Sequence, residues 1–232
     1  MARSTTGGRF DLETTFEITY FGLRWGMVAL AVNFPLLLWW GGHVFRNLPL
    51  QDSMSAYYLT EMRDWFVGIL FSVAACLYLY KGLSEKENYL LNGAGVFAVG
   101  IAVSPLNWHP DWLPRDFSPH GAFAILFFAT IALACWLCQD DSLNLGLIPA
   151  PDRSRYRIKY SATGVALVVL PCMAFLLNIG IFARPFESSI FWVEAVSIWV
   201  FAFYWYTKSG ELREAARRES RERLPRATGQ HA

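Results

Sequence analysis

Apolar residues occur in six long runs along the chain, and shorter polar or proline-containing stretches separate these runs. The runs cover residues 20–40, 65–80, 89–103, 121–137, 160–182 and 188–206. About 20 apolar residues are needed to cross a hydrocarbon layer roughly 30 Å thick, so each run is a candidate transmembrane helix, of which 89–103 is the shortest. The pattern predicts an all-α fold, an integral membrane bundle of six transmembrane helices.

Lysine and arginine are distributed unequally between the two sides that this topology defines. Basic residues gather before residue 20, in 81–86, in 153–159 and after 207, whereas the opposite side holds Arg46, Arg63, Arg115 and Arg184. Cytoplasmic loops carry the excess of basic residues. We therefore expect both termini in the cytoplasm, with an N-terminal tail over 1–19, a transmembrane domain over 20–207 and a charged C-terminal tail over 208–232.

The composition favours the same class of protein, because 54% of the residues are hydrophobic and only 17% are charged. The cysteines lie within or at the end of apolar runs, so we expect reduced thiols that serve in packing. Cys135 and Cys138 have the spacing of a redox motif, but no thioredoxin-like strand precedes them. Acidic residues interrupt the amino terminus, so we expect the first helix to be retained and not cleaved as a signal peptide.

Two runs contain residues with a specific packing role. Ala94, Ala98 and Ala102 recur every four residues, a pattern that lets helix backbones approach closely, so we expect this helix to be packed and to offer a contact for an oligomer or partner subunit. Asn33 and Pro35 predict a kink in the first helix, because proline lacks the backbone N–H that a helix uses.

A polar stretch, 51–64, lies between the first two runs and on the outer side of the membrane. The ionisable and hydroxyl residues on this side are the candidate site residues. Glu194 is prominent, because an acid inside an apolar helix needs a partner or a wet cavity. The candidate catalytic residues are Asp64, His120, Glu194 and Ser53, and the candidate ligand-binding residues are Ser55, Tyr57, Tyr58, Arg63 and Arg184.

Three chemistries could use these residues. Ser53 or Ser55 with His120 and an acid, Asp64 or Glu194, would form a lipid hydrolase, although neither serine lies in a Gly-x-Ser-x-Gly turn. A metal site could draw on these ionisable groups together with His43 and His109, but no closely spaced histidine pair supports it, and we expect no metal or other cofactor. In the third, the arginines and tyrosines bind a lipid headgroup without catalysis.

Several segments resemble a group of uncharacterised bacterial six-helix inner-membrane proteins. They are residues 53–58, 63–68 and 91–98, His120, and residues 191–195. The chain is also distantly similar to the eukaryotic family of the autophagy modulator DRAM and the FGF-receptor-activating protein, which is linked to lipid remodelling. A looser similarity to the alkaline ceramidase and adiponectin-receptor hydrolases is opposed by the absence of their seventh helix and their paired-histidine motif. The resemblance implies a multi-pass protein of the bacterial inner membrane.

We expect an outward-facing polar pocket that binds, and in one version modifies, a lipid or other amphipathic small molecule. Membrane lipids are the expected partners, and no nucleic acid is expected. The alternative is a non-enzymatic transporter or accessory subunit. The inner halves of the predicted helices contain few ionisable groups, which argues against a proton or ion path.

Overall fold

The computed structural model describes residues 12–106, 118–141 and 150–228, with side chains in 18–106, 118–141 and 152–214. Within these ranges the chain is helical and contains no strand, which confirms the all-α class. The long helices are α1 (Leu12–Leu36), α3 (Arg63–Leu79), α4 (Glu85–Val103), α5 (Pro119–Leu137), α6 (Ala150–Asn178) and α7 (Ser189–Thr228). Three short elements join α1 to α3: the π-helix η1 (Leu37–Gly41), α2 (Gly42–Arg46) and the 3₁₀-helix η2 (Ser55–Leu59).

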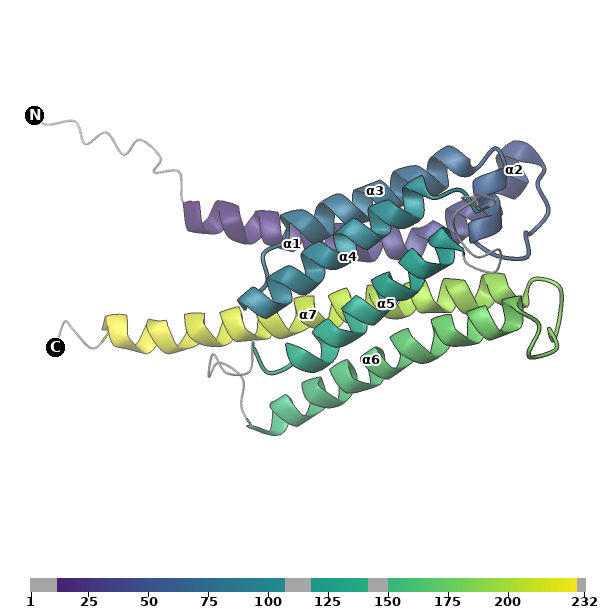
Figure 1. Ribbon diagram of the computed structural model, residues 1–232. Helices are drawn as coiled ribbons and strands as arrows, with labels where there is room; N and C mark the ends of the chain where they lie inside the picture. Colours follow the sequence, from purple (N-terminus) through teal and green to yellow (C-terminus); the bar gives the residue numbers. More distant parts are fainter. Residues whose placement is uncertain (1–11, 107–117, 142–149, 229–232) are drawn as a thin grey trace, which may run out of the picture.

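The long helices pack side by side in chain order, and α7 packs against both α6 and α1, which closes the bundle into a ring. The chain termini extend from one end of the bundle, and α2 lies at the opposite end (Figure 1). We call these the termini end and the Ser55 end. Loops that are distant in sequence therefore meet at the Ser55 end.

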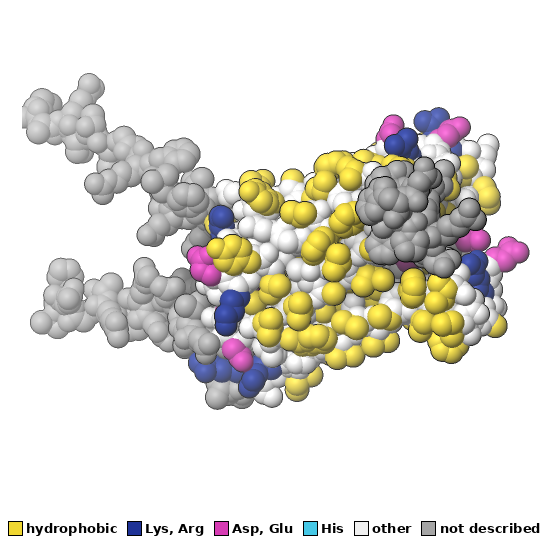
Figure 2. All heavy atoms as spheres, in the orientation of Figure 1, with side chains coloured by type: hydrophobic (Ala, Val, Ile, Leu, Met, Phe, Trp, Pro, Cys, Tyr) yellow, Lys and Arg dark blue, Asp and Glu magenta, His cyan; other side chains and the backbone are white. Residues whose placement is uncertain are grey.

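Within the described residues, four helical segments are long and apolar enough to cross a membrane: Ile18–Arg46, Pro119–Leu137, Asp152–Asn178 and Ser189–Glu214. Figure 2 shows hydrophobic side chains over the middle of the visible face and charged side chains at its two ends. These features are typical of a membrane protein. Helix α3 has 17 residues and α4 opens with charged residues, and neither is among the four. Six membrane crossings and the orientation of the termini therefore remain predictions.

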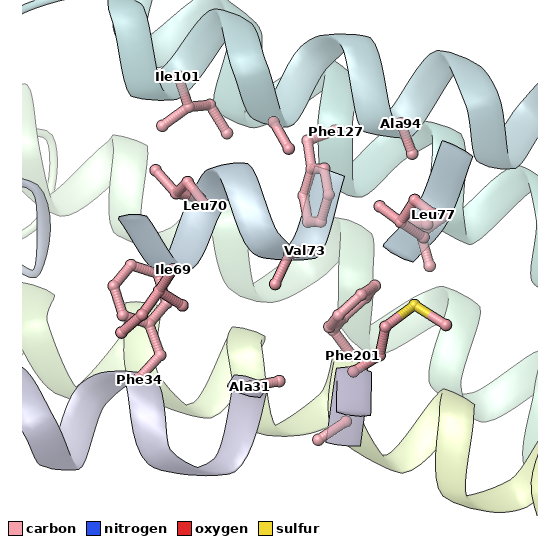
Figure 3. Close-up of a cluster of buried hydrophobic side chains, with 14 of the residues drawn as sticks. Ala31, Phe34, Ile69, Leu70, Val73, Leu77, Ala94, Ile101, Phe127 and Phe201 are labelled. Carbon is pink, nitrogen blue, oxygen red and sulfur yellow. The ribbon is translucent and has the colours of Figure 1, made fainter. Parts of the chain in front are cut away.

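The bundle interior is filled by apolar side chains from α1, α3, α4, α5 and α7, which point toward one another in Figure 3. On α4, Ala94 and Ala98 are completely buried, which confirms that the small-residue face packs inside the protein. A Cβ on Gly100 would lie 2.6 Å from the Phe123 ring of α5, so this glycine permits the close approach of the two helices.

Some helix boundaries differ from the sequence prediction. Helix α1 begins at Leu12, inside the segment predicted as a tail, and α7 continues to Thr228. The sequence predicted a connection between the runs 121–137 and 160–182, but α6 already begins at Ala150, so the second half of that connection is helical. Polar residues can continue a helix beyond an apolar run because the backbone hydrogen bonds are made within the helix. Near Pro35 the α-helical pattern gives way to η1, consistent with the loss of one backbone donor.

Candidate functional site

The polar stretch 51–64 is attached to the start of α7 and folds over the Ser55 end. The backbone N–H of Phe191 donates to the carbonyl oxygen of Asp52 at 2.9 Å. Ser53 Oγ accepts a hydrogen bond from the backbone N–H of Ala56 at 3.0 Å, so the Ser53 side chain caps the first turn of η2. These contacts fix the position of Ser55 at the beginning of η2.

Ser55 contacts His120, the second residue of α5. Ser118 caps this helix by accepting a hydrogen bond from the backbone N–H of Gly121, and Pro119 is its first residue, where a proline removes no helical hydrogen bond. Nδ1 of His120 lies 2.9 Å from the carbonyl oxygen of Ser104, and Nε2 lies 3.1 Å from Ser55 Oγ. A carbonyl oxygen only accepts, so Nδ1 must carry a proton, and in the neutral imidazole Nε2 accepts from Ser55.

Glu194 of α7 contacts the same loop from the other side. The backbone N–H of Met54 donates to Oε2 of Glu194 at 2.6 Å, and Ser55 interacts with this carboxylate through its backbone and its hydroxyl. Among the described residues, no lysine or arginine forms an ion pair with Glu194. Ser55 therefore lies between an imidazole and a carboxyl group.

The three side chains can share two protons in two arrangements. In the first, His120 is neutral, Ser55 donates to Nε2, and a protonated Glu194 donates to Ser55. In the second, His120 is a cation that donates to both Ser104 and Ser55, and Ser55 donates to the Glu194 carboxylate. The two arrangements differ in which of His120 and Glu194 holds one proton, and the net charge of the site is the same in both.

The site lies at one end of a cavity of about 80 Å³ between α1, α3, α4, α5 and α7. Ser55, His120 and Glu194 are its polar lining, and the remaining lining is apolar: Ala31, Phe34, Met54, Phe66, Leu70, Val73, Ile101, Ala124, Phe127, Phe128, Ile198 and Phe201. Several of these side chains surround a common space in Figure 3. A water molecule needs about 10–15 Å³ of such a cavity, so this one has room for a small chemical group.

The two tyrosines of the predicted site are packing residues at the rim. Tyr57 is completely buried, with its ring centroid 6.0 Å from that of Phe191, and burial raises the pKa of its phenol above the ordinary value. Tyr58 packs edge-on against Phe66 and receives a hydrogen bond from Arg63 at 3.1 Å. Both tyrosines therefore hold η2 against the helices.

The predicted charged residues at the rim lie outside the cavity. Asp64 is exposed and lines a shallow groove on the outer face of α3 together with Trp65 and Ser72. Arg184 forms an exposed ion pair with Asp52 at 3.5 Å. The structure therefore brings together Ser55, His120 and Glu194, and it leaves Asp64 and the arginines apart from them.

The metal hypothesis has no support in the described part of the chain. No group of three or more histidine, cysteine, aspartate or glutamate residues there is placed to hold a metal ion. His43 is exposed on α2, and His109 lies outside the described residues.

A second buried ionic cluster, at the termini end, was missed by the sequence analysis. Glu87 of α4 and Lys208 of α7 are 0% and 2% exposed, and Oε1 of Glu87 lies 2.6 Å from Nζ of Lys208. The backbone N–H of Leu83 donates to Glu87 at 2.8 Å, and the hydroxyl of Tyr160 donates to Glu211 at 2.5 Å. Glu87 and Lys208 lie just outside the predicted runs 89–103 and 188–206, so the pattern of apolar residues does not reveal that they are buried. The spacing of Lys208 and Glu211 on one helical face was the available signal.

Comparisons of the chain with protein-family models, with curated proteins and with solved structures found no match. The class of protein is therefore defined by the structure: a helical bundle in which four helices are long and apolar enough to cross a membrane. Its internal cavity has one polar end, formed by Ser55, His120 and Glu194.

Proposed function

We propose that this chain is a multi-pass membrane protein that binds a lipid or other amphipathic small molecule. The polar end of the ligand lies at Ser55, His120 and Glu194, and an adjoining apolar part enters the cavity. The supporting observation is that these three polar groups converge at one end of an otherwise apolar cavity. Ligand sites usually combine a mostly apolar lining with a few placed polar groups, and ionisable residues within membrane helices usually mark a site.

The proposed topology has six membrane crossings, cytoplasmic termini and a location in the bacterial inner membrane. The basic residues at the termini end support this orientation through the positive-inside rule. In this orientation the Ser55 end faces outward. The ligand then enters from the outer leaflet or from the outer aqueous phase.

An apolar layer favours binding over transport. Val73, Leu77, Phe127 and Phe201 are buried in the core of the bundle, and Phe201 lies on α7 midway between Glu194 and Lys208. A path for ions or polar solutes needs a lining that continues from one side to the other. In this protein, apolar side chains separate the two polar regions, so the polar lining does not continue from one end of the bundle to the other.

The binding proposal is tested by filling the cavity. Ala124 lines the cavity, and Ala162 is exposed on the outer face of α6, so Ala124→Phe and Ala162→Phe add the same group inside and outside. Each variant is purified in nanodiscs, and the amphiphiles that it retains are quantified by mass spectrometry. We expect Ala124→Phe to lower the retained ligand by about tenfold, equivalent to about 1.4 kcal/mol. Equal retention by both variants would reject the cavity as the binding site.

A second candidate function is the hydrolysis of an ester in the bound molecule. The 3.1 Å contact between Ser55 Oγ and His120 Nε2, with Nδ1 held by a carbonyl, is the geometry of a nucleophile beside its base. Ser55 Oγ would attack the ester carbonyl carbon while His120 takes the hydroxyl proton and returns it to the departing alcohol. Water would then release the acyl group from Ser55.

A fluorophosphonate probe tests this second candidate, because it labels activated serines. We expect labelling of the wild-type protein and of Ser53→Ala, and no labelling of Ser55→Ala. A wild-type protein that stays unlabelled would exclude Ser55 as a nucleophile and leave the binding function intact.

A further inference from the structure

Glu194 differs from other acidic residues of the bundle in its partners. At the Ser55 end, Glu61 pairs with Arg46 at 3.3 Å and Asp52 pairs with Arg184 at 3.5 Å. Glu194 lines the cavity and is held by hydrogen bonds from the loop, without a lysine or arginine partner among the described residues. An ionised carboxylate away from water is costly unless a positive charge compensates it. With His120 neutral, a cationic ligand could supply this charge.

The lining of the cavity favours the same kind of ligand. Five phenylalanine rings contribute to it, and the set is Phe34, Phe66, Phe127, Phe128 and Phe201. Aromatic rings attract organic cations, and they also accommodate the alkyl groups attached to the nitrogen. An anionic group would instead meet the Glu194 carboxylate with no arginine or lysine lining the cavity. The combination of one acid and several aromatic rings selects for an organic cation.

We propose, building on the function proposed above, that the ligand carries a positively charged amine that pairs with Glu194. The amine is a protonated primary amine or a quaternary ammonium group, and its alkyl part lies among the phenylalanine rings. A cavity of about 80 Å³ accommodates the charged nitrogen and a few carbon atoms, while a longer chain extends away from it. The amine is supplied either by a lipid headgroup or by a free small molecule.

The proposal is tested with three probes that share one alkyl chain and differ in charge: decyltrimethylammonium, decanol and decanoate. Binding to the full chain in phosphatidylglycerol nanodiscs is measured by calorimetry, with empty nanodiscs subtracted. We expect decyltrimethylammonium to bind at least about tenfold more tightly than decanol, and decanoate to bind most weakly. Glu194→Gln should remove the preference for the ammonium probe, so that decyltrimethylammonium binds no more tightly than decanol. Glu187→Gln, which changes an exposed acid at the same end, should have no effect.

The outcomes separate this inference from the binding function. Equal binding of the three probes, lost in Ala124→Phe, would overturn the amine and keep the cavity as a binding site. Binding that Ala124→Phe does not change would overturn both. If Glu194→Gln does not fold, Glu194→Asp keeps the charge and should keep the ammonium preference. Loss of that preference in a folded Glu194→Asp protein, with decanol still bound, would count against a simple charge pair.

Two further arms identify the source of the amine. Competition by tetramethylammonium would support a free small cation, because this probe has no lipid chain. Weaker binding of decyltrimethylammonium in nanodiscs that contain phosphatidylethanolamine would support the lipid headgroup. If neither tetramethylammonium nor phosphatidylethanolamine competes with the probe, the proposal that the natural ligand carries an amine is overturned.

Discussion

The Ser55 site and the Glu87–Lys208 pair are two polar regions of one bundle, and both use α7. Glu87 is neutralised within the chain, because Lys208 Nζ lies 2.6 Å away and the backbone of Leu83 donates to it. Glu194 has hydrogen bonds from the Met54 loop and no such cation among the described residues, and it lines a cavity. A closed ion pair needs nothing from outside, whereas an open carboxylate beside a cavity can receive a ligand. The comparison separates Glu87, which is neutralised within the protein, from Glu194, for which we propose a binding role.

Neutralising Glu87 is expected to produce the largest loss of stability. Glu87→Gln leaves the ammonium group of Lys208 buried without its counter-charge, and breaking a buried pair in this way costs about 3–5 kcal/mol. The free energy of unfolding in bicelles measures this loss. The double variant Glu87→Gln with Lys208→Met is the control, because it removes both charges and should recover most of the stability. A single variant as stable as the wild type would contradict a structural role for the pair.

Helix α4 connects the two regions. Glu87 lies near its start, and Ser104, whose carbonyl oxygen contacts His120, follows its end. Gly100 lies in the last turn of this helix, where it packs against α5. A Cβ at Gly100 would lie 2.6 Å from the Phe123 ring, whereas a Cβ at Gly93 would lie 3.9 Å from Thr130. We expect Gly100→Ala to lower the free energy of unfolding by about 1–3 kcal/mol through overpacking. Gly93→Ala on the same helix should change it little. Equal effects of the two variants would show that the close packing of α4 against α5 at Gly100 does not determine the free energy of unfolding.

Removing the Ser55 hydroxyl should lower the free energy of unfolding less than neutralising Glu87 does. Ser55→Ala leaves Nε2 of His120 without its partner, and an unsatisfied buried group of this kind costs about 1–3 kcal/mol. Ser53→Ala removes only a cap of η2 and should cost about 1 kcal/mol. Thermal unfolding in nanodiscs ranks the two variants. A greater loss for Ser53→Ala would indicate that the loop, and not the His120 contact, dominates this region.

The sequence predicted much of the fold because its signals are local. The six apolar runs correspond to the six long helices, and Ser118 and Pro119 begin α5 as their types predict. The sequence singled out Glu194 as a candidate because an acid in an apolar run has few structural explanations, and its role stays a prediction.

Other features depend on contacts between distant parts of the chain, and the sequence could not supply them. Ser53 and Ser55 are two residues apart in similar surroundings, and only the fold of η2 separates the cap from the site residue. Asp64 follows the same loop but faces the surface groove of α3. Glu87 and Lys208 look like interfacial residues at the ends of apolar runs, and their pairing appears only when α4 and α7 come together.

The smallest expected change in stability comes from Glu194→Gln, and it tests the comparison most sharply. The same chemical change that breaks the pair at Glu87 separates Glu194 from no lysine or arginine, and the amide oxygen can still accept from Met54. We therefore expect the free energy of unfolding without ligand to change by no more than about 1 kcal/mol, or to rise. It is measured beside Glu87→Gln in the same bicelles. A loss as large as that of Glu87→Gln would mean that Glu194 also serves chiefly to hold the bundle together. A neutral result, combined with loss of ammonium binding, would assign the Glu194 charge to the ligand, because a charge retained without a contribution to folding needs another role.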